Sequence, residues 1–131
     1  MSNIFSKIIA GQIPCYKIAE DENFLAFLDA SPLKKGHSLV VPKKEVDYIF
    51  DLDNETYTGL MSFSKRVAKA IEKSILCKRI SVHIIGLEVS HAHVHLIPIN
   101  GMNDCNFANT KLKLRKEEFE ELAKEISKKF E

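Results

Sequence analysis

The chain has 131 residues, of which 45% are hydrophobic and 28% are charged, and its formal net charge is +1. A chain of this length can bury a core without metal ions or disulfides, so we expect a single domain over residues 1–131. The near-neutral charge argues against a nucleic-acid-binding protein, which needs a strongly basic surface.

The cysteines and the N-terminus bear on the cellular compartment. Cys15, Cys77 and Cys105 are scattered and form no CxxC pair, so neither a disulfide framework nor a zinc knuckle is indicated. The N-terminal residues lack the apolar core of a secretory signal, and no segment reaches transmembrane length. We therefore expect a cytoplasmic protein with no membrane partner.

The first third of the chain combines one helical pattern with several strand patterns. Apolar residues recur at helical spacing over residues 4–9, with Ser2 or Asn3 as the N-cap and Gly11 just beyond the end. Pro32 excludes a helix in the loop that follows the second strand. The strands are expected at residues 15–21, 23–29 and 37–42.

The strongest helical pattern spans residues 54–74, with Asp53 as a plausible N-cap. Its apolar stripe consists of Leu60, Phe63, Val67, Ala70 and Ile71. Two more strands are expected, at residues 78–85 and 91–99.

The last part of the chain is expected to be irregular over residues 101–115 and then to form an amphipathic helix at about residues 116–130. Because helices and strands do not alternate strictly, a doubly wound parallel sheet is disfavoured. The sequence predicts an α+β fold with a mostly antiparallel sheet of about five strands, a long central helix and a C-terminal helix.

The segment "HAHVHLIP", residues 91–98, holds three of the five histidines. Alternate residues of a strand share a face, so the imidazoles of His91, His93 and His95 are expected to lie on one face. The apolar residues between them face the other way. Two kinds of chemistry suit this pattern: a metal ion bound by an HxH pair, or nucleophilic and acid–base chemistry on phosphorus.

Three segments together favour the phosphorus chemistry. The triad segment "RISVHIIGLEVSHAHVHLIP" follows "FLDASPLKKGHSLVVPKK", and the chain opens with "IFSKIIAGQIP". In this order, over residues 4–98, they resemble the histidine triad (HIT) family of nucleotide hydrolases and transferases. The compact chain is most similar to the Hint branch of that family, the nucleoside phosphoramidases.

The resemblance implies a role for each histidine. His93 is the nucleophile that attacks the α-phosphorus, and His91 orients it through its backbone carbonyl. His95 donates to a non-bridging phosphate oxygen, and His37 helps to protonate or orient the leaving group.

The resemblance also implies a nucleotide-binding set. Asp29 would bind the ribose hydroxyls, although it could merely start the turn before Pro32. The base pocket would be lined by Phe5, Ile8 and Phe27, which on spacing alone would belong to the core.

Three positions depart from the pattern of the family. His83 stands where the Hint branch usually has asparagine, which leaves the preference for a leaving group open. Glu88 replaces a small hydroxyl residue and would repel a phosphate unless it turns away or restricts the substrates. Ala30 replaces a larger aliphatic residue and could enlarge the nucleoside pocket.

The resemblance therefore implies hydrolysis of nucleoside 5′-phosphoramidates, with purine nucleotides or nucleotide conjugates as ligands and no metal or cofactor. The alternatives are a Fhit-like dinucleoside polyphosphate hydrolase, a nucleotide-binding adaptor and a metal hydrolase. It also implies a homodimer, for which the helix at residues 54–74 and its neighbouring strand are the candidate interface.

Overall fold

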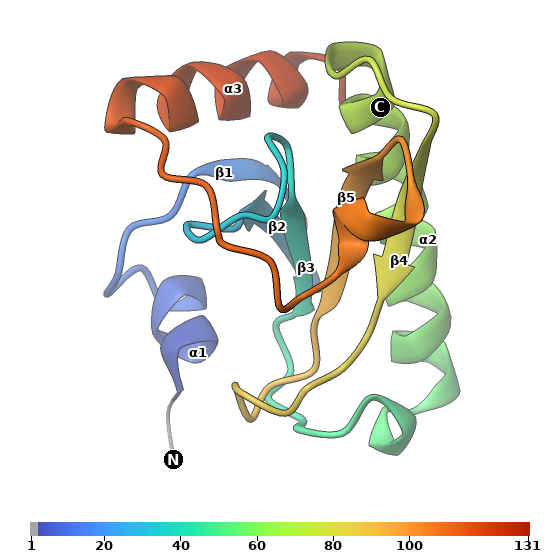
Figure 1. Cartoon of the computed structure of the whole chain (residues 1–131). Helices are drawn as coiled ribbons and strands as arrows, with labels where there is room; N and C mark the ends of the chain where they lie inside the picture. The colour runs from blue at the N-terminus through green and yellow to red at the C-terminus, as the bar shows by residue number, and fades with distance from the viewer. Residues whose placement is uncertain (1–2) are drawn as a thin grey trace.

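The computed structural model describes residues 3–131 and contains a five-stranded sheet in the order β1-β2-β3-β5-β4, with every neighbouring pair antiparallel (Figure 1). The α+β expectation is thereby confirmed. The elements are α1 (Ile4–Ile9), β1 (Lys17–Glu20), β2 (Phe24–Leu28), β3 (Ser38–Pro42), α2 (Asn54–Ser74), β4 (Arg79–His83), β5 (Val94–Ile99) and α3 (Lys116–Lys128), with single 3₁₀ turns at Ile49–Asp51 and Met102–Cys105.

Helices cover both faces of the sheet, as Figure 1 shows. The long α2 and the C-terminal α3 pack on one face, where the expected apolar stripe of α2 is buried in the larger core. The short α1 packs on the other face, where Phe5 meets Leu25 and Phe27 of β2. Every residue of β2 and β3 is buried because both faces of these strands are covered.

Alternation along β2 and β3 decides which side chains reach the α1 face. Leu25 and Phe27 point toward α1, while Ala26 between them lies in the core under α2. Continuing this alternation by one step places Asp29 on the α1 face just beyond β2. The same argument places His37 there, just before β3.

The first helix is capped as the sequence predicted. The Asn3 side chain accepts from the Ser6 N–H at 2.9 Å, and the Ser6 hydroxyl accepts from the Asn3 N–H at 2.8 Å. Ser2, the other candidate cap, lies outside the described residues. Asp53 stands at the N-cap position of α2, but its carboxylate accepts no backbone N–H of that helix.

The triad strand begins later than predicted, which corrects the expected strand at residues 91–99. β5 starts at Val94, so His91 and His93 precede it in irregular backbone. The ladder between β3 and β5 ends at the Val40–Val94 pair, and Pro42, two residues further along β3, has no N–H to donate to it. The Ala92 N–H instead donates to the Val46 carbonyl at 2.8 Å.

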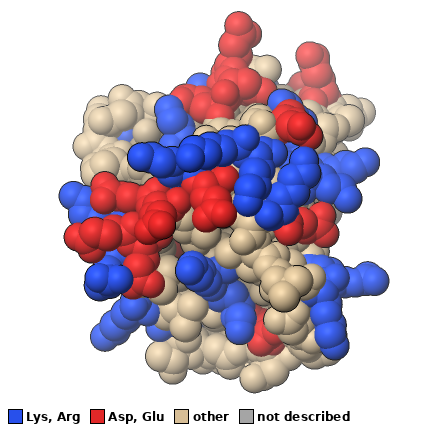
Figure 2. Space-filling view, turned by 90° about the horizontal axis from the view of Figure 1, so that it is seen from above, with Lys and Arg blue, Asp and Glu red and all other residues tan. Residues whose placement is uncertain are grey.

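The surface carries no single-sign field on the face seen from above in Figure 2, where acidic and basic side chains are interspersed. None of the helices in residues 3–131 is long and apolar enough to cross a membrane. The cysteines at positions 15, 77 and 105 are all free thiols.

Candidate functional site

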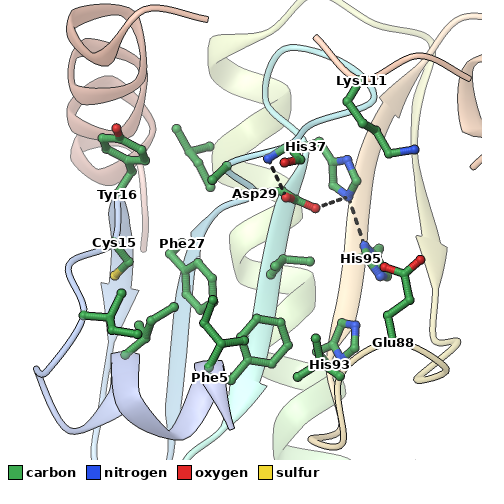
Figure 3. Close-up of a pocket in the computed structure, with 18 of the residues that line it drawn as sticks. Phe5, Cys15, Tyr16, Phe27, Asp29, His37, Glu88, His93, His95 and Lys111 are labelled. Atoms are coloured by element: carbon green, nitrogen blue, oxygen red, sulfur yellow. Dashed lines mark hydrogen bonds and ion pairs between the residues drawn. The ribbon is translucent and has the colours of Figure 1, made fainter. Parts of the chain in front are cut away.

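A cavity of about 570 Å³ lies between α1 and the uncovered end of the sheet, closed at its sides by residues 85–89 and by Phe107 and Lys111 (Figure 3). Eight of the ten predicted site residues line it: Phe5, Ile8, Phe27, Asp29, Ala30, His37, His93 and His95, and Glu88 lines it too. His91 and His83 do not. Side chains from α1, from β2 and β3 and the residues next to them, and from the triad segment at the start of β5 therefore meet in one hollow.

His93 is held in one tautomer by its neighbour. Its Nδ1 lies 2.7 Å from the His91 carbonyl oxygen, and a carbonyl can only accept, so Nδ1 carries the proton and donates. The other ring nitrogen, Nε2, is then left with its lone pair. The ring is almost fully buried and packs edge-on against Phe5 at 4.9 Å, which restricts its rotation.

His91 acts from behind the cavity rather than inside it. Its ring is completely buried, and Nε2 donates to the Pro42 carbonyl at 2.8 Å. Its Nδ1 lies 3.4 Å from Nδ2 of the Asn3 side chain, and Asn3 is the residue that caps α1. His91 thereby ties the triad segment to β3 and α1, and fixes the carbonyl that orients His93.

A second chain of hydrogen bonds fixes His37 and His95. The Leu33 N–H donates to Nδ1 of His37 at 3.0 Å, so the proton of neutral His37 lies on Nε2. Nε2 lies 3.0 Å from Nδ1 of His95 and donates to it. His95 must then carry its own proton on Nε2, and it offers this N–H next to His93, whose ring centroid is 4.9 Å away.

Burial keeps these rings uncharged. Desolvation, reinforced by the neighbouring His95, lowers the pKa of His37 to about 3, and desolvation together with His93 lowers that of His95 to about 4. The pKa of His93 is also lowered, chiefly by desolvation. At neutral pH the site therefore holds neutral imidazoles, with an unprotonated Nε2 on His93 beside an N–H donor on His95.

Asp29 lies at the end of β2, where its Oδ1 accepts from the Ser31 N–H at 2.9 Å. Its Oδ2 is 3.5 Å from Nε2 of His37. Burial raises the pKa of the Asp29 carboxyl, and the Ser31 N–H and the ammonium of Lys111 oppose that rise. The turn-forming bond to Ser31 is present and Asp29 also lies in the cavity wall, while its contact with the ribose hydroxyls stays a prediction.

The cavity is also lined by residues that were not predicted from the sequence, among them Phe107 and Lys111. Phe107 contacts the rings of His95 and His83, with centroid separations of 5.0 and 5.4 Å. Nζ of Lys111 donates to the Phe107 carbonyl at 2.7 Å and to the Asn109 carbonyl at 3.2 Å. Both residues come from the irregular segment after β5, which has no periodicity to interpret.

His83 lies on β4 directly opposite His95 in register, and its Nε2 is 3.1 Å from the Ser81 hydroxyl. Since it stands outside the cavity wall, its expected contact with a nucleotide stays a prediction. His83 can act on the site through Phe107 or His95.

One group of residues has the spacing of a metal site. The ligand atoms of Asp29, His37 and His95 lie within 4.8 Å of one another. A metal-bound imidazole normally donates its other N–H to an acceptor, whereas Nδ1 of His37 receives the N–H of Leu33. Binding a metal through Nε2 of His37 would therefore require this ring to give up its backbone contact.

These features define a class of protein in which a pocket beneath a short helix holds neutral, hydrogen-bonded imidazoles from a triad segment. The chain belongs to the HIT family, because the HIT domain model matches residues 10–102.

Relatives and solved structures agree with this assignment. An uncharacterised HIT-like protein of Borreliella burgdorferi is 35% identical over 95% of both chains. An adenosine 5′-monophosphoramidase of Schizosaccharomyces pombe is 40% identical over 75% of this chain and 74% of its own length. The crystal structure of a Hit-like protein from Bartonella henselae superposes with a TM-score of 0.85, at 32% identity over 98% of this chain and 96% of that one.

Proposed function

We propose that the protein hydrolyses nucleoside 5′-phosphoramidates, with purine nucleotides as the expected substrates, through a nucleotidyl intermediate on His93. The observation that carries this proposal is the hydrogen bond from Nδ1 of His93 to the His91 carbonyl, which leaves Nε2 as a neutral nucleophile on the cavity wall. The 40% identity to an adenosine 5′-monophosphoramidase supports the same substrate class.

In the first step Nε2 of His93 forms a bond to the α-phosphorus while the bond from phosphorus to the leaving nitrogen breaks. The leaving amine takes up a proton from water. The N–H of His95 donates to a phosphate oxygen, where negative charge increases in the transition state. The apolar end of the cavity, near Phe5 and Phe27, would hold the base, and Asp29 would accept from the ribose hydroxyls.

In the second step water attacks the phosphorus and the bond to His93 breaks, which releases the nucleotide and a proton to solvent. Nδ1 keeps its proton on the His91 carbonyl throughout, so the imidazole departs as a neutral ring. The two steps together consume one water and yield one nucleoside monophosphate and one amine.

His37 has a narrower role in this scheme than the resemblance implied. Its Nδ1 is occupied by the Leu33 N–H, so it cannot take a second proton there and pass one on to the leaving group. It instead fixes the tautomer of His95 by donating to Nδ1. It therefore acts as a positioning residue.

The test measures AMP release from adenosine 5′-phosphoramidate by metal-stripped wild type and by His93→Ala, with thermal unfolding of both proteins to show that they fold. We expect turnover by wild type, loss in the variant and partial rescue by added imidazole, which can occupy the vacated volume. Turnover that needs added zinc, or activity retained in His93→Ala, would overturn the mechanism. Turnover of dinucleoside polyphosphates alone would favour the Fhit-like alternative.

The homodimer is a separate proposal that rests on family resemblance. In this fold β4 is an edge strand, and exposed Val82 and Leu76 lie on or near it. Size-exclusion chromatography with light scattering at micromolar concentration tests it, and a monomer would refute it.

A further inference from the structure

The cavity wall carries few charged side chains, and they are not spread evenly between its two ends. Among the lining residues the charged groups are Asp29, Glu88 and Lys111. The end formed by Ile8, Phe27 and Cys15 has no charged group. Figure 3 shows Glu88 at the opposite end, with His93 and His95.

Lys111 and Glu88 both act on Asp29, but they act on different histidines. The positive charge of Lys111 lowers the pKa of both His37 and Asp29, so it acts where the ribose would lie. The negative charge of Glu88 raises the pKa of both His93 and Asp29, so it acts at the nucleophile. Glu88 is exposed and belongs to the loop between β4 and β5.

The location of Glu88 determines which part of a substrate it meets. In the proposed binding mode, with the base at the apolar end and the phosphorus at Nε2 of His93, the leaving group is the part of the substrate that reaches the end of the cavity where Glu88 lies. A carboxylate at this point adds repulsion to a phosphate that is already negative. A positive charge on the leaving group would offset that repulsion, and further phosphates would increase it.

We propose that Glu88 selects the leaving group by charge, favouring amines that carry a cationic group and disfavouring polyphosphates. This inference rests on the proposed function and narrows its substrate class. Lys111 does not take the place of Glu88 at the nucleophile: its Nζ is held by the carbonyls of Phe107 and Asn109, and its charge acts on His37 and Asp29, whereas that of Glu88 acts on His93.

The test compares three adenosine 5′-phosphoramidates with matched tails, made from 1,3-diaminopropane, butylamine and β-alanine. Their tails are cationic, neutral and anionic, respectively. The proteins are wild type, Glu88→Gln, Glu88→Lys and the control Glu120→Gln, which removes the same charge from an exposed site on α3. Each kcat/KM is measured, and Kd for the same three compounds is measured in the His93→Ala background.

We expect wild type and Glu120→Gln to prefer the cationic over the anionic compound by about tenfold, the product of an attraction and a repulsion typical of partly exposed charges. Glu88→Gln should bring the ratio close to one, and Glu88→Lys should invert it. A ratio in Glu88→Gln equal to that of wild type would overturn the inference.

The binding measurement separates the two proposals. If no protein turns over any compound but Kd shows the same charge ranking, the proposed hydrolysis fails while charge selection by Glu88 stands. If turnover occurs and neither kcat/KM nor Kd responds to the tail, the hydrolysis stands and the role of Glu88 is refuted.

Discussion

The neutral state of the buried imidazoles predicts that acid destabilises the protein well above the pH at which carboxylates titrate. The unfolded chain protonates its histidines below a pH of about 6.5. The native state resists protonation because the pKa of His37 falls to about 3 and that of His95 to about 4. The unfolded state therefore binds more protons in this range, and stability is complete above about pH 6.5 and decreases toward pH 4.

The magnitude follows from the two shifts. Below about pH 6.5, each of the two rings lowers the free energy of unfolding by about 1.4 kcal/mol per pH unit. Between pH ~7 and ~5 the loss is about 2 kcal/mol per ring. His95 is partly exposed, so solvent screening reduces its share, and we expect a total loss of about 2–4 kcal/mol. A loss of this size is a large fraction of the stability of an ordinary domain.

Urea unfolding followed by circular dichroism at the two pH values measures this loss. The double variant His37→Gln, His95→Gln should lose most of the pH dependence, since it removes both titrating rings while it keeps groups that can form hydrogen bonds. Equal free energies of unfolding at pH ~7 and ~5 in wild type would refute the reasoning. An unchanged difference in the double variant would refute it too.

Three further predictions concern single residues. Asn3→Ala should lower the free energy of unfolding by about 1 kcal/mol through the lost cap, and it should also lower kcat. Ser6→Ala breaks the same capping box but should leave kcat unchanged, because of these two residues only Asn3 contacts His91. Equal kcat values for the two variants would contradict this. Asp29→Asn should shrink the preference for ribonucleotide over 2′-deoxyribonucleotide substrates, seen in KM, and an unchanged preference would remove Asp29 from the ribose site. Lys111→Met should raise the pKa of His37, because it removes a cation that lowers this pKa. NMR titration of the histidine rings measures the change, and an unchanged or lower pKa of His37 would contradict the prediction.

The fold could be predicted from the sequence to the extent that local pattern decides it. The helix at residues 54–74 was predicted to the residue because its apolar stripe and its start are both local features. The expected C-terminal helix ends at Lys128 rather than near residue 130, and Phe130 packs on Phe63 from beyond the helix. The start of β5 was missed because it depends on Pro42 and Val46, which are distant in sequence.

The site divides in the same way. The alternation of side chains along β2 and β3 predicts that Phe27, Asp29 and His37 lie on one face of the sheet, so these side chains could be placed from the sequence. The direction of the His37–His95 hydrogen bond could not, because it depends on the N–H of Leu33 across a loop. Lys111 lies in an irregular segment, and only the folded chain brings it to the cavity.

The central claim is that Nε2 of His93 attacks phosphorus without a metal. Metal-stripped wild type mixed with adenosine 5′-phosphoramidate, quenched within the first turnover and digested for peptide mass spectrometry, tests it most directly. An adenylyl group on His93 that forms and decays at the rate of turnover is the predicted result. An adduct on another residue, or turnover with no adduct and a requirement for added metal, would contradict it.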